Sequence, residues 1–444
     1  MKRVLLIGAG RSTASLINYL IEQAQPNNWK IKIVDRSIDH IKNKYSKFNF
    51  ISVESLDISE TSRTREFIAE SDIVISMLPA HMHTSIAKAC VEYKKHMVTA
   101  SYISDDMKAL EEEAKEAGVI IMNEIGVDPG IDHLSAKKVI DEIVEEGGKL
   151  VGFESFTGGL VAPESDDNPW NYKFTWNPRN VVVAGQGGAV KFIQEGTYKY
   201  IPYHKLFRRT EIIDIEGFGK FEGIANRDSL KYRSVYDLED IKTMYRGTLR
   251  RPGFCRAWDA FVQLGATDDS YTLPNSEEMT HREFINLFLP YNPTDSVELK
   301  LRHYLNLAHD EIALFEKLEW LDLFKDIPVG LKNATPAQIL QKILERKWTL
   351  APTDKDMIVM WHKFNYTLNG NDFEKHSSMV IKGKNMEETA MAMTVGYPVA
   401  IATKMILNEV ITTPGVHIPI QKEIYEPILK ELEDYGVVFN EKLV

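Results

Sequence analysis

From Met1 to about Ile125, short apolar segments alternate with segments whose apolar residues recur at helical spacing. This alternation is typical of a parallel sheet whose strands are connected by helices. It predicts six strands, at 3–7, 30–34, 50–53, 72–78, 96–100 and 119–122. It also predicts helices at 12–23, 61–69, 84–93 and 106–117. The first part of the chain is therefore expected to form a doubly wound α/β domain.

A further helix is expected to open at Asp128-Pro129 and to continue to about Glu146, because Asp can cap free amides and Pro fits the first helical position. After Gly147-Gly148 the pattern changes to strands without intervening helices. They are predicted at 151–156, 181–184, 209–215 and 243–249. This second region is predicted to be a mixed α+β domain.

Residues 276–347 have a helical pattern, with a helix start at Thr335-Pro336 and a break at Asn292-Pro293. Two more strands, at 357–368 and 377–381, flank the turn signal Asn369-Gly370-Asn371. The tail is predicted to contain helices at 389–407 and 422–435 and a final strand. The predicted domains are 1–133 with 386–444 packed back on it, 134–275 with 351–385, and a helical insertion at 276–350.

The chain has 444 residues, 44% of them hydrophobic, and its 53 Lys and Arg against 64 Asp and Glu give a net charge of −11. This composition excludes a disordered chain. Because the basic residues are scattered, a nucleic-acid surface or a polybasic membrane anchor is not expected. A small molecule is the expected partner.

The two cysteines, Cys90 and Cys255, form no CxxC pattern, so neither a disulfide framework nor a thiolate zinc site is expected. The histidines show no HExxH or paired spacing, and no metal is expected. The N-terminus runs directly into a strand, and the weakly polar stretch 390–401 is shorter than the roughly 20 residues of a membrane span. These features favour a reducing, cytoplasmic location.

A glycine-rich turn, Gly8-Ala9-Gly10, follows the first predicted strand and opens the first helix. Gly8 permits a tight turn, and Gly10 lets the backbone approach a pyrophosphate attracted by the helix N-terminus. The predicted contacts are Gly8, Gly10, Arg11, Ser12 and Thr13, and Ala14 stands where a third glycine is often found. An ordinary strand-to-helix turn is the alternative, but this position favours a Rossmann dinucleotide-binding domain.

Asp35 ends the second predicted strand, 25 positions beyond Gly10, where a carboxylate can accept hydrogen bonds from the adenosine ribose. This favours NAD. The adjacent Arg36 can pair with a 2′-phosphate or stack on adenine, so NADP stays open, as does the alternative that both are loop-facing charges. Further cofactor contacts are expected at two other strand ends, from Asp57, Ile58, Met77 and Leu78, unless these are plain loop residues.

Several motifs follow in a fixed order. They are Thr99-Ala100-Ser101-Tyr102, Asn123 to His133, Gly158-Gly159-Leu160, Ala162-Pro163-Glu164, Lys173 to Arg179, Asn226-Arg227-Asp228-Ser229, Arg246 to Arg250, Thr394 to Pro398 and Lys422 to Tyr425. Together they resemble the saccharopine dehydrogenase family, in particular its glutamate-forming saccharopine reductases, over nearly the whole chain.

The resemblance implies a homodimer with a Rossmann domain, a substrate domain and a helical insertion. It implies oxidation of the secondary amine saccharopine, with hydride passing to nicotinamide and the imine hydrolysed to glutamate and 2-aminoadipate 6-semialdehyde. The implied substrate contacts are Ser101, Tyr102, Asp128, Arg227, Thr248 and Arg250, with Asp128 as catalytic acid or base and Trp176 at the cofactor. Arg suits the three carboxylates of saccharopine.

Plainer roles stay open for several of these residues. Arg227 and Arg250 could form surface ion pairs, and Asp128 could be only a helix cap. His133 could act as a general base, although a lone helical histidine more often packs structurally.

The chain departs from the family pattern at two places: Thr157 stands where many members have Cys, and Ile224-Ala225 replaces an aromatic-Pro pair. The first departure excludes a role that needs a thiol, and the second leaves the exact amine open. Two alternative functions are therefore kept beside the saccharopine reaction. A carboxynorspermidine or carboxyspermidine dehydrogenase would need acidic groups for its diamine, and Arg227 and Arg250 favour saccharopine. A non-catalytic dinucleotide sensor would keep the fold alone.

Overall fold

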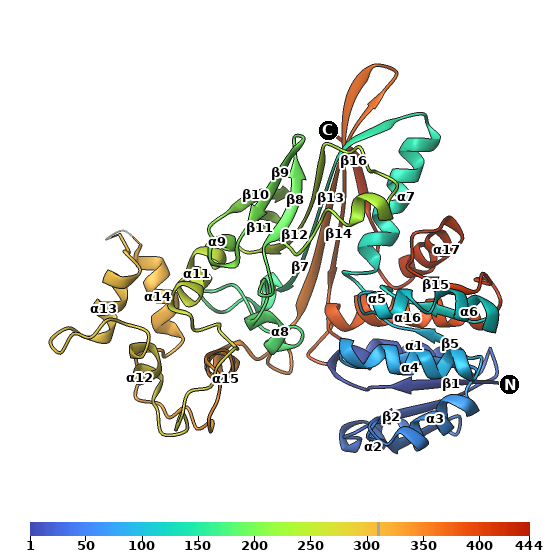
Figure 1. The fold of residues 1–444 in the computed structure, drawn as a ribbon, viewed down its shortest axis with the longest axis horizontal. Coiled ribbons are helices and arrows are strands. Elements are labelled where there is room, and N and C mark those ends of the chain that lie inside the picture. Colours follow the sequence, from blue (N-terminus) through green and yellow to red (C-terminus); the bar gives the residue numbers. More distant parts are fainter. Residues whose placement is uncertain (309–310) are drawn as a thin grey trace. The chain divides into compact units, whose positions relative to one another are not determined.

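The computed structural model describes residues 1–308 and 311–444, and Arg11 only by its backbone. The chain divides into two compact units. Unit 1 comprises Met1–Leu150, Tyr366–Asp372 and Met379–Lys442. Unit 2 comprises Val151–Asn365, Phe373–Ser378 and Leu443–Val444, so it includes the stretch 276–350. The elements of both units are labelled in Figure 1.

Unit 1 contains a seven-stranded sheet in the order β15-β6-β5-β4-β1-β2-β3, and all its pairs are parallel. Its strands are β1 (Lys2–Ile7), β2 (Trp29–Asp35), β3 (Ile51–Ser55), β4 (Ile73–Ser76), β5 (His96–Val98), β6 (Ile120–Met122) and β15 (Gly415–His417). The order 3-2-1-4-5-6 is that of dinucleotide-binding folds, with the switch point between β1 and β4. The predicted fold class and its six strands are confirmed, and β15 is an additional strand that the sequence pattern did not predict.

Helices connect and cover these strands (Figure 1). They are η1 (Arg11–Thr13), α1 (Ala14–Ala24), α2 (Asp39–Tyr45), α3 (Thr61–Glu70), η2 (Ala80–Met82), α4 (His83–Glu92), α5 (Asp105–Lys108), α6 (Glu111–Ala117), α7 (Ile131–Glu145), α16 (Ala390–Leu407) and α17 (Lys422–Glu433). The single helix predicted at 106–117 is two helices, and α2 was not predicted.

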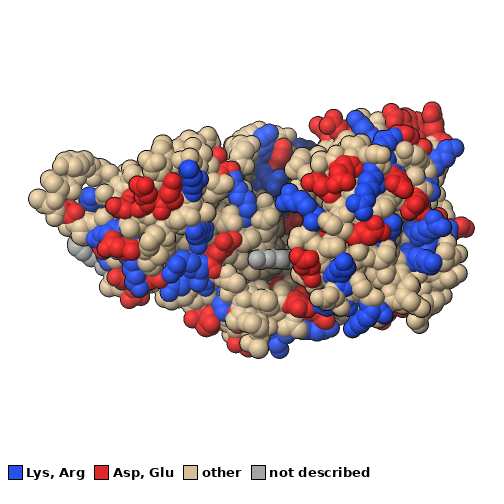
Figure 2. Space-filling model, turned by 90° about the horizontal axis from the view of Figure 1, so that it is seen from below, with Lys and Arg blue, Asp and Glu red and all other residues tan. Residues whose placement is uncertain are grey.

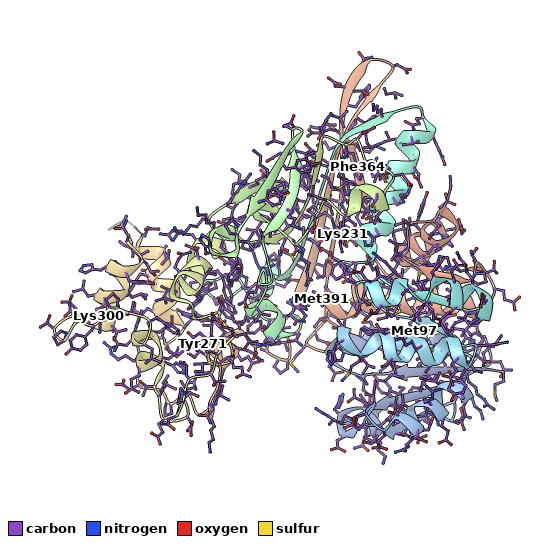
Figure 3. All side chains as sticks on the ribbon, viewed as in Figure 1. Met97, Lys231, Tyr271, Lys300, Phe364 and Met391 are labelled. Carbon is purple, nitrogen blue, oxygen red and sulfur yellow. The ribbon has the colours of Figure 1, made fainter. Side chains whose placement is uncertain are left out.

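The core of unit 1 is built from strands buried on both faces, which explains their continuous apolar sequences. Val4, Leu5, Leu6 and Ile7 of β1 are at most 2% exposed. Met97, labelled in Figure 3, is fully buried in β5. The carboxyl ends of these strands are thereby held in fixed positions along one edge.

Helix α16 packs on α1. A Cβ atom at Gly396 would lie 2.7 Å from the backbone nitrogen of Leu16, so glycine is required for this close approach. By length and composition α16 is the one helix of the described residues that is apolar enough to cross a membrane, but 89% of it is buried. Its apolar character is therefore explained by its place in the core of unit 1.

The predicted helix start at Asp128-Pro129 is wrong. The Asp128–Pro129 bond is cis, α7 begins at Ile131, and its N-cap is Gly130 with φ +146°. The side chain that accepts a hydrogen bond there belongs to Asp132, whose Oδ1 lies 2.6 Å from the Gly130 nitrogen. Asp128 is therefore not the cap of this helix.

The second sheet has nine strands, with the path β10-β11-β12-β7-β13-β14-β16 and the hairpin β8–β9 attached to β12. Its strands are β7 (Lys149–Val161), β8 (Val190–Gln194), β9 (Thr197–Ile201), β10 (Thr210–Ile215), β11 (Gly219–Ala225), β12 (Thr243–Arg250), β13 (Asp356–Leu368), β14 (Asn371–Lys382) and β16 (Asn440–Leu443). The turn predicted at Asn369-Gly370 joins β13 to β14, and both residues have positive φ, as a two-residue hairpin turn requires. On β13, Phe364 (Figure 3) packs against Phe153 of β7 with 5.2 Å between ring centroids.

The helices of unit 2 are mostly short. They are η3 (Pro163–Ser165), α8 (Pro178–Val182), α9 (Tyr203–Leu206), α10 (Tyr232–Val235), α11 (Phe254–Leu264), α12 (His281–Asn286), α13 (Val297–Tyr304), α14 (Ile312–Trp320) and α15 (Pro336–Trp348). Thr335 caps α15 through a capping box, which confirms the predicted helix start. The strand predicted at 181–184 is wrong: Asn177 caps α8 and Pro178 takes its first position, and these two signals outweigh the run of valines.

Candidate active site

The glycine turn lies directly after β1, at the carboxyl edge of the sheet in unit 1. Gly8 has φ +95°, and a Cβ there would lie 2.7 Å from the carbonyl oxygen of Met77 at the end of β4. Gly10 is exposed, and a Cβ there would meet nothing within 4 Å. Gly8 is therefore needed for the fold of the turn, whereas Gly10 leaves open space beside the helix start, as a bound pyrophosphate requires.

Asp35, at the end of β2, holds this turn. Its Oδ2 accepts a hydrogen bond from the Ala9 nitrogen at 2.7 Å, and its Oδ1 accepts one from the Ser37 nitrogen at 2.9 Å. Nε2 of His40 lies 3.0 Å from the Ala9 carbonyl oxygen. The carboxylate predicted to bind a ribose thus already has a structural role, while the adjacent Arg36 is exposed.

The other predicted cofactor residues lie around the same edge. Thr13 is buried and donates from Oγ1 to the Gly10 carbonyl at 2.7 Å, and Ser12 is half-buried. Asp57 accepts a hydrogen bond from the Ser59 nitrogen, which lowers the pKa of its carboxyl. Ile58, Met77 and Leu78 are half-buried beyond β3 and β4. The side chain of Arg11 lies outside the described residues.

Ser101 follows β5 and is joined to a buried histidine that the sequence analysis missed. Nε2 of His83 lies 2.6 Å from the Ser101 Oγ, and its Nδ1 lies 2.9 Å from the Ser76 Oγ. Burial lowers the pKa of His83 to about 4, helped by nearby His81 and opposed by a hydrogen bond to the Leu78 backbone. No sequence motif marks this histidine, because its partners come from the ends of two different strands.

Tyr102 and Asp128 also meet at this edge. The Tyr102 hydroxyl donates to Oδ1 of Asp128 at 3.1 Å, and both side chains are half-buried. Beside them the Ile103 nitrogen donates to Oε1 of Glu124 at 2.9 Å. Three of the predicted substrate residues therefore lie in unit 1: Ser101 and Tyr102 follow β5, and Asp128 follows the neighbouring strand β6.

Unit 2 carries two further predicted substrate residues, Thr248 and Arg250, on strand β12. Thr248 of β12 is the register partner of Thr157 on parallel β7, so the two side chains share a face of the sheet, and Arg250 follows two residues later on that face. The Arg250 guanidinium lies 5.3 Å from the centre of the Tyr172 ring and 5.4 Å from that of Phe254. Arg250 is 8% exposed, so it is not a surface ion-pair residue.

Among the buried polar atoms without a hydrogen-bond partner within the described chain are Thr157 Oγ1 and Arg250 Nε of this face, Oη of the adjacent Tyr172, and Thr175 Oγ1. A buried donor left without a partner costs about 1–3 kcal/mol, so such atoms commonly mark a site that a polar ligand completes. Arg246, which the sequence analysis left unassigned, lies on the same face, 7% exposed, with its guanidinium 4.1 Å from the centre of the Tyr232 ring. Its alternation with Thr248 and Arg250 was the signal that could have found it.

Arg227 and Trp176 are placed differently. Arg227 follows β11, has φ +49° and is exposed, and its carbonyl oxygen accepts a hydrogen bond from the Lys191 nitrogen. Trp176 is half-buried, next to the unpartnered Thr175.

Figure 2 shows Lys and Arg interspersed with Asp and Glu over the face that it draws. Within residues 1–308 and 311–444, no group of three or more His, Cys, Asp or Glu side chains is arranged to hold a metal ion.

Comparison with known proteins identifies relatives over the whole chain. The model of the saccharopine dehydrogenase NADP binding domain matches residues 4–122, and that of the saccharopine dehydrogenase C-terminal domain matches residues 126–437. The chain is 34% identical to the saccharopine dehydrogenase [NADP(+), L-glutamate-forming] of Saccharomyces cerevisiae, over 100% of the chain and 99% of that protein. It is 33% identical to the mitochondrial alpha-aminoadipic semialdehyde synthase of Rattus norvegicus, of which it covers 47%.

A solved structure agrees with these matches. The apo saccharopine dehydrogenase (L-Glu forming) from Saccharomyces cerevisiae superposes with a TM-score of 0.90 at 34% identity, covering 100% of both chains. The N-terminal family model and the yeast relative are both named for NADP, which gives no support to the predicted preference for NAD.

Proposed function

Because the chain belongs to the saccharopine dehydrogenase family, we propose that it interconverts saccharopine with L-glutamate and 2-aminoadipate 6-semialdehyde, using NADP(H), in lysine metabolism. The observation that carries this proposal is the 34% identity, over both full lengths, to a relative named for that reaction. A TM-score of 0.90 to the yeast structure supports the same substrate class.

In the oxidative direction the carbon–nitrogen single bond of the secondary amine loses a hydride and a proton and becomes an imine, which water then cleaves to an aldehyde and the amine of glutamate. Nicotinamide accepts the hydride when it is bound. Water attack and the departure of glutamate require a group that removes one proton and returns another. We assign this role to Asp128, whose Oδ1 is held by the Tyr102 hydroxyl in a half-buried position.

The polar face of β7 and β12 supports a carboxylate-rich substrate. Arg250 is buried and its Nε lacks a partner, as does Oγ1 of Thr157 on the neighbouring strand. These atoms are donors, and they suit the carboxylates of saccharopine better than a diamine, which would need acceptors. In this proposal Arg227, Thr248 and Trp176 keep the roles that the family resemblance implies.

For the cofactor we propose NADP(H) over NAD(H). Asp35 directs its carboxylate towards the amides of Ala9 and Ser37, so its first role is to hold the turn. Exposed Arg36 is the adjacent cation and suits a 2′-phosphate. The open space at Gly10 fits the pyrophosphate.

A homodimer and a reducing, cytoplasmic location complete the proposal. Cys90 and Cys255 are buried free thiols, which is compatible with a reducing compartment. Light scattering of the purified chain tests the dimer, and fractionation of the source cells tests the location.

The activity is tested with purified protein, saccharopine and NADP⁺, by following the absorbance of NADPH. Parallel assays with NAD⁺ and with carboxynorspermidine give the cofactor and substrate preferences. We expect turnover with saccharopine and NADP⁺ to exceed both alternatives. Turnover with carboxynorspermidine alone would assign the chain to polyamine synthesis, and NADPH binding without any turnover would identify a dinucleotide sensor.

A further inference from the structure

His83 occupies an unusual place in unit 1. It is the first residue of α4, it is 3% exposed, and its two ring nitrogens contact serines that follow or end different strands. Ser76 ends β4, and Ser101 lies just beyond β5. These strands are neighbours in the sheet and lie on the side of the switch point opposite to β2.

The geometry makes His83 a bridge. Its Nδ1 is 2.9 Å from the Ser76 Oγ and its Nε2 is 2.6 Å from the Ser101 Oγ, and Ser76 is only 1% exposed. A neutral imidazole has one donor and one acceptor nitrogen, so it fixes the direction of the hydroxyl proton at each of its partners. A serine hydroxyl otherwise rotates freely about its Cβ–Oγ bond.

We propose that His83 is a positioning residue, which holds the Ser101 hydroxyl in one orientation towards the substrate and nicotinamide. This inference rests on the proposed function, because it takes Ser101 as a ligand contact. His83 itself does not touch the ligand and exchanges no proton with it.

The tautomer determines what Ser101 presents. If Nδ1 carries the proton and donates to Ser76, Nε2 accepts the Ser101 proton, and the Ser101 oxygen is left to accept an N–H from the ligand. The opposite tautomer makes Ser101 a donor to a carboxylate. In either arrangement the two contacts of the ring fix the orientation of the Ser101 hydroxyl, and the ring-nitrogen measurement below distinguishes the two tautomers.

Three substitutions separate the two hydrogen bonds. The amide of His83→Asn can reach only the position of Nδ1, so it can keep the contact with Ser76. The longer amide of His83→Gln can reach the position of Nε2, so it can keep the contact with Ser101. The ring of His83→Phe fills the space and forms neither hydrogen bond. We expect His83→Phe to lower kcat for saccharopine by about tenfold or more, with the Kd for NADPH changed by less than about threefold. His83→Gln should recover most of that loss, and His83→Asn should not. His81→Ala, an exposed neighbour, is the matched control.

A double-mutant cycle distinguishes positioning from general stability. In a Ser101→Ala background, His83→Phe should have little further effect on kcat, because the group that it orients is absent. Equal losses in both backgrounds, or normal kcat in His83→Phe, would overturn the proposal.

A spectroscopic measurement keeps the inference separate from the activity. In protein labelled with ¹⁵N-histidine, His83 should show one protonated ring nitrogen, and its Nε2 resonance should shift in Ser101→Ala. An Nε2 resonance that is the same in Ser101→Ala as in wild type would overturn the proposal. Wild-type protein that shows the predicted resonances but no turnover of saccharopine would contradict the proposed function and leave the bridge intact.

Discussion

The imidazole of His133 lies with Nε2 2.8 Å from Oε2 of Glu124, and both side chains are almost completely buried. Glu124 has φ +54°, and its other carboxylate oxygen accepts the Ile103 nitrogen. This pair therefore fixes the segment that carries Ser101 and Tyr102. Since His133 is 0% exposed, this contact gives it a structural role instead of that of a general base.

Removing the imidazole should destabilise unit 1. His133→Ala takes a donor from a buried carboxylate, and breaking such a buried pair costs about 3–5 kcal/mol. Urea unfolding at pH 7 measures the loss in free energy of unfolding. His133→Gln, which can place an amide near the Nε2 position, should lose less, and an alanine variant as stable as wild type would show that the pair contributes nothing.

Asp128 should be catalytic without being structural. It does not cap α7, whose N-cap is Gly130, so Asp128→Asn should leave the fold and the Kd for NADPH unchanged. We expect kcat to fall at least about tenfold, because an amide cannot accept the proton. Undiminished turnover in the asparagine variant would exclude Asp128 as the acid or base.

Cofactor choice should depend on Arg36 more than on Asp35. Arg36→Ala removes the adjacent cation and should raise the KM for NADPH by about tenfold, with little change for NADH. Asp35→Ala loosens the turn at Ala9 and should weaken both cofactors. If Asp35→Ala weakens NADH alone, the carboxylate binds the ribose as the sequence first indicated.

Acid should destabilise the protein in part through His83. Its pKa falls from 6.5 in the unfolded chain to about 4 in the fold, because burial disfavours the charged ring and nearby His81 adds to this. The unfolded state then binds more protons between these values, so stability is lost as pH falls from about 6.5 to 4, by about 3 kcal/mol for this group. Urea unfolding at pH 7 and pH 4.5 should show a smaller acid loss in His83→Gln than in wild type; equal losses would mean that His83 is protonated in the fold.

The sequence predicted the central strands of the first sheet well because strands such as β4 and β6 are buried on both faces and give continuous apolar runs. It failed where the start of a helix is decided locally, at Asn177-Pro178 and at Gly130, because a single N-cap side chain or a single backbone conformation sets the start and no periodic pattern does. The candidate active site shows a similar division between residues that the sequence reveals and residues that only the fold reveals. Gly8, Asp35 and the alternation of Arg246 with Arg250 could be found from spacing along the chain, whereas His83 depends on which strand ends the fold brings together.

The two glycines of the turn should fail in different ways. Gly8→Ala needs an L-residue at φ +95° and puts its Cβ 2.7 Å from the Met77 carbonyl, so the turn or the end of β4 must move. Backbone strain of this kind costs about 1–3 kcal/mol, and the clash adds to it. Thermal unfolding should show a lower Tm before any cofactor is added.

Gly10 has φ −77°, which any residue can adopt, and a Cβ there would meet no atom within 4 Å, so the Gly10→Ala variant should fold with an unchanged Tm. Its methyl group instead lies where the pyrophosphate must approach, and the Kd for NADPH should rise by about tenfold or more, as fluorescence titration would measure. A Gly10→Ala variant that binds NADPH like wild type would place the pyrophosphate elsewhere.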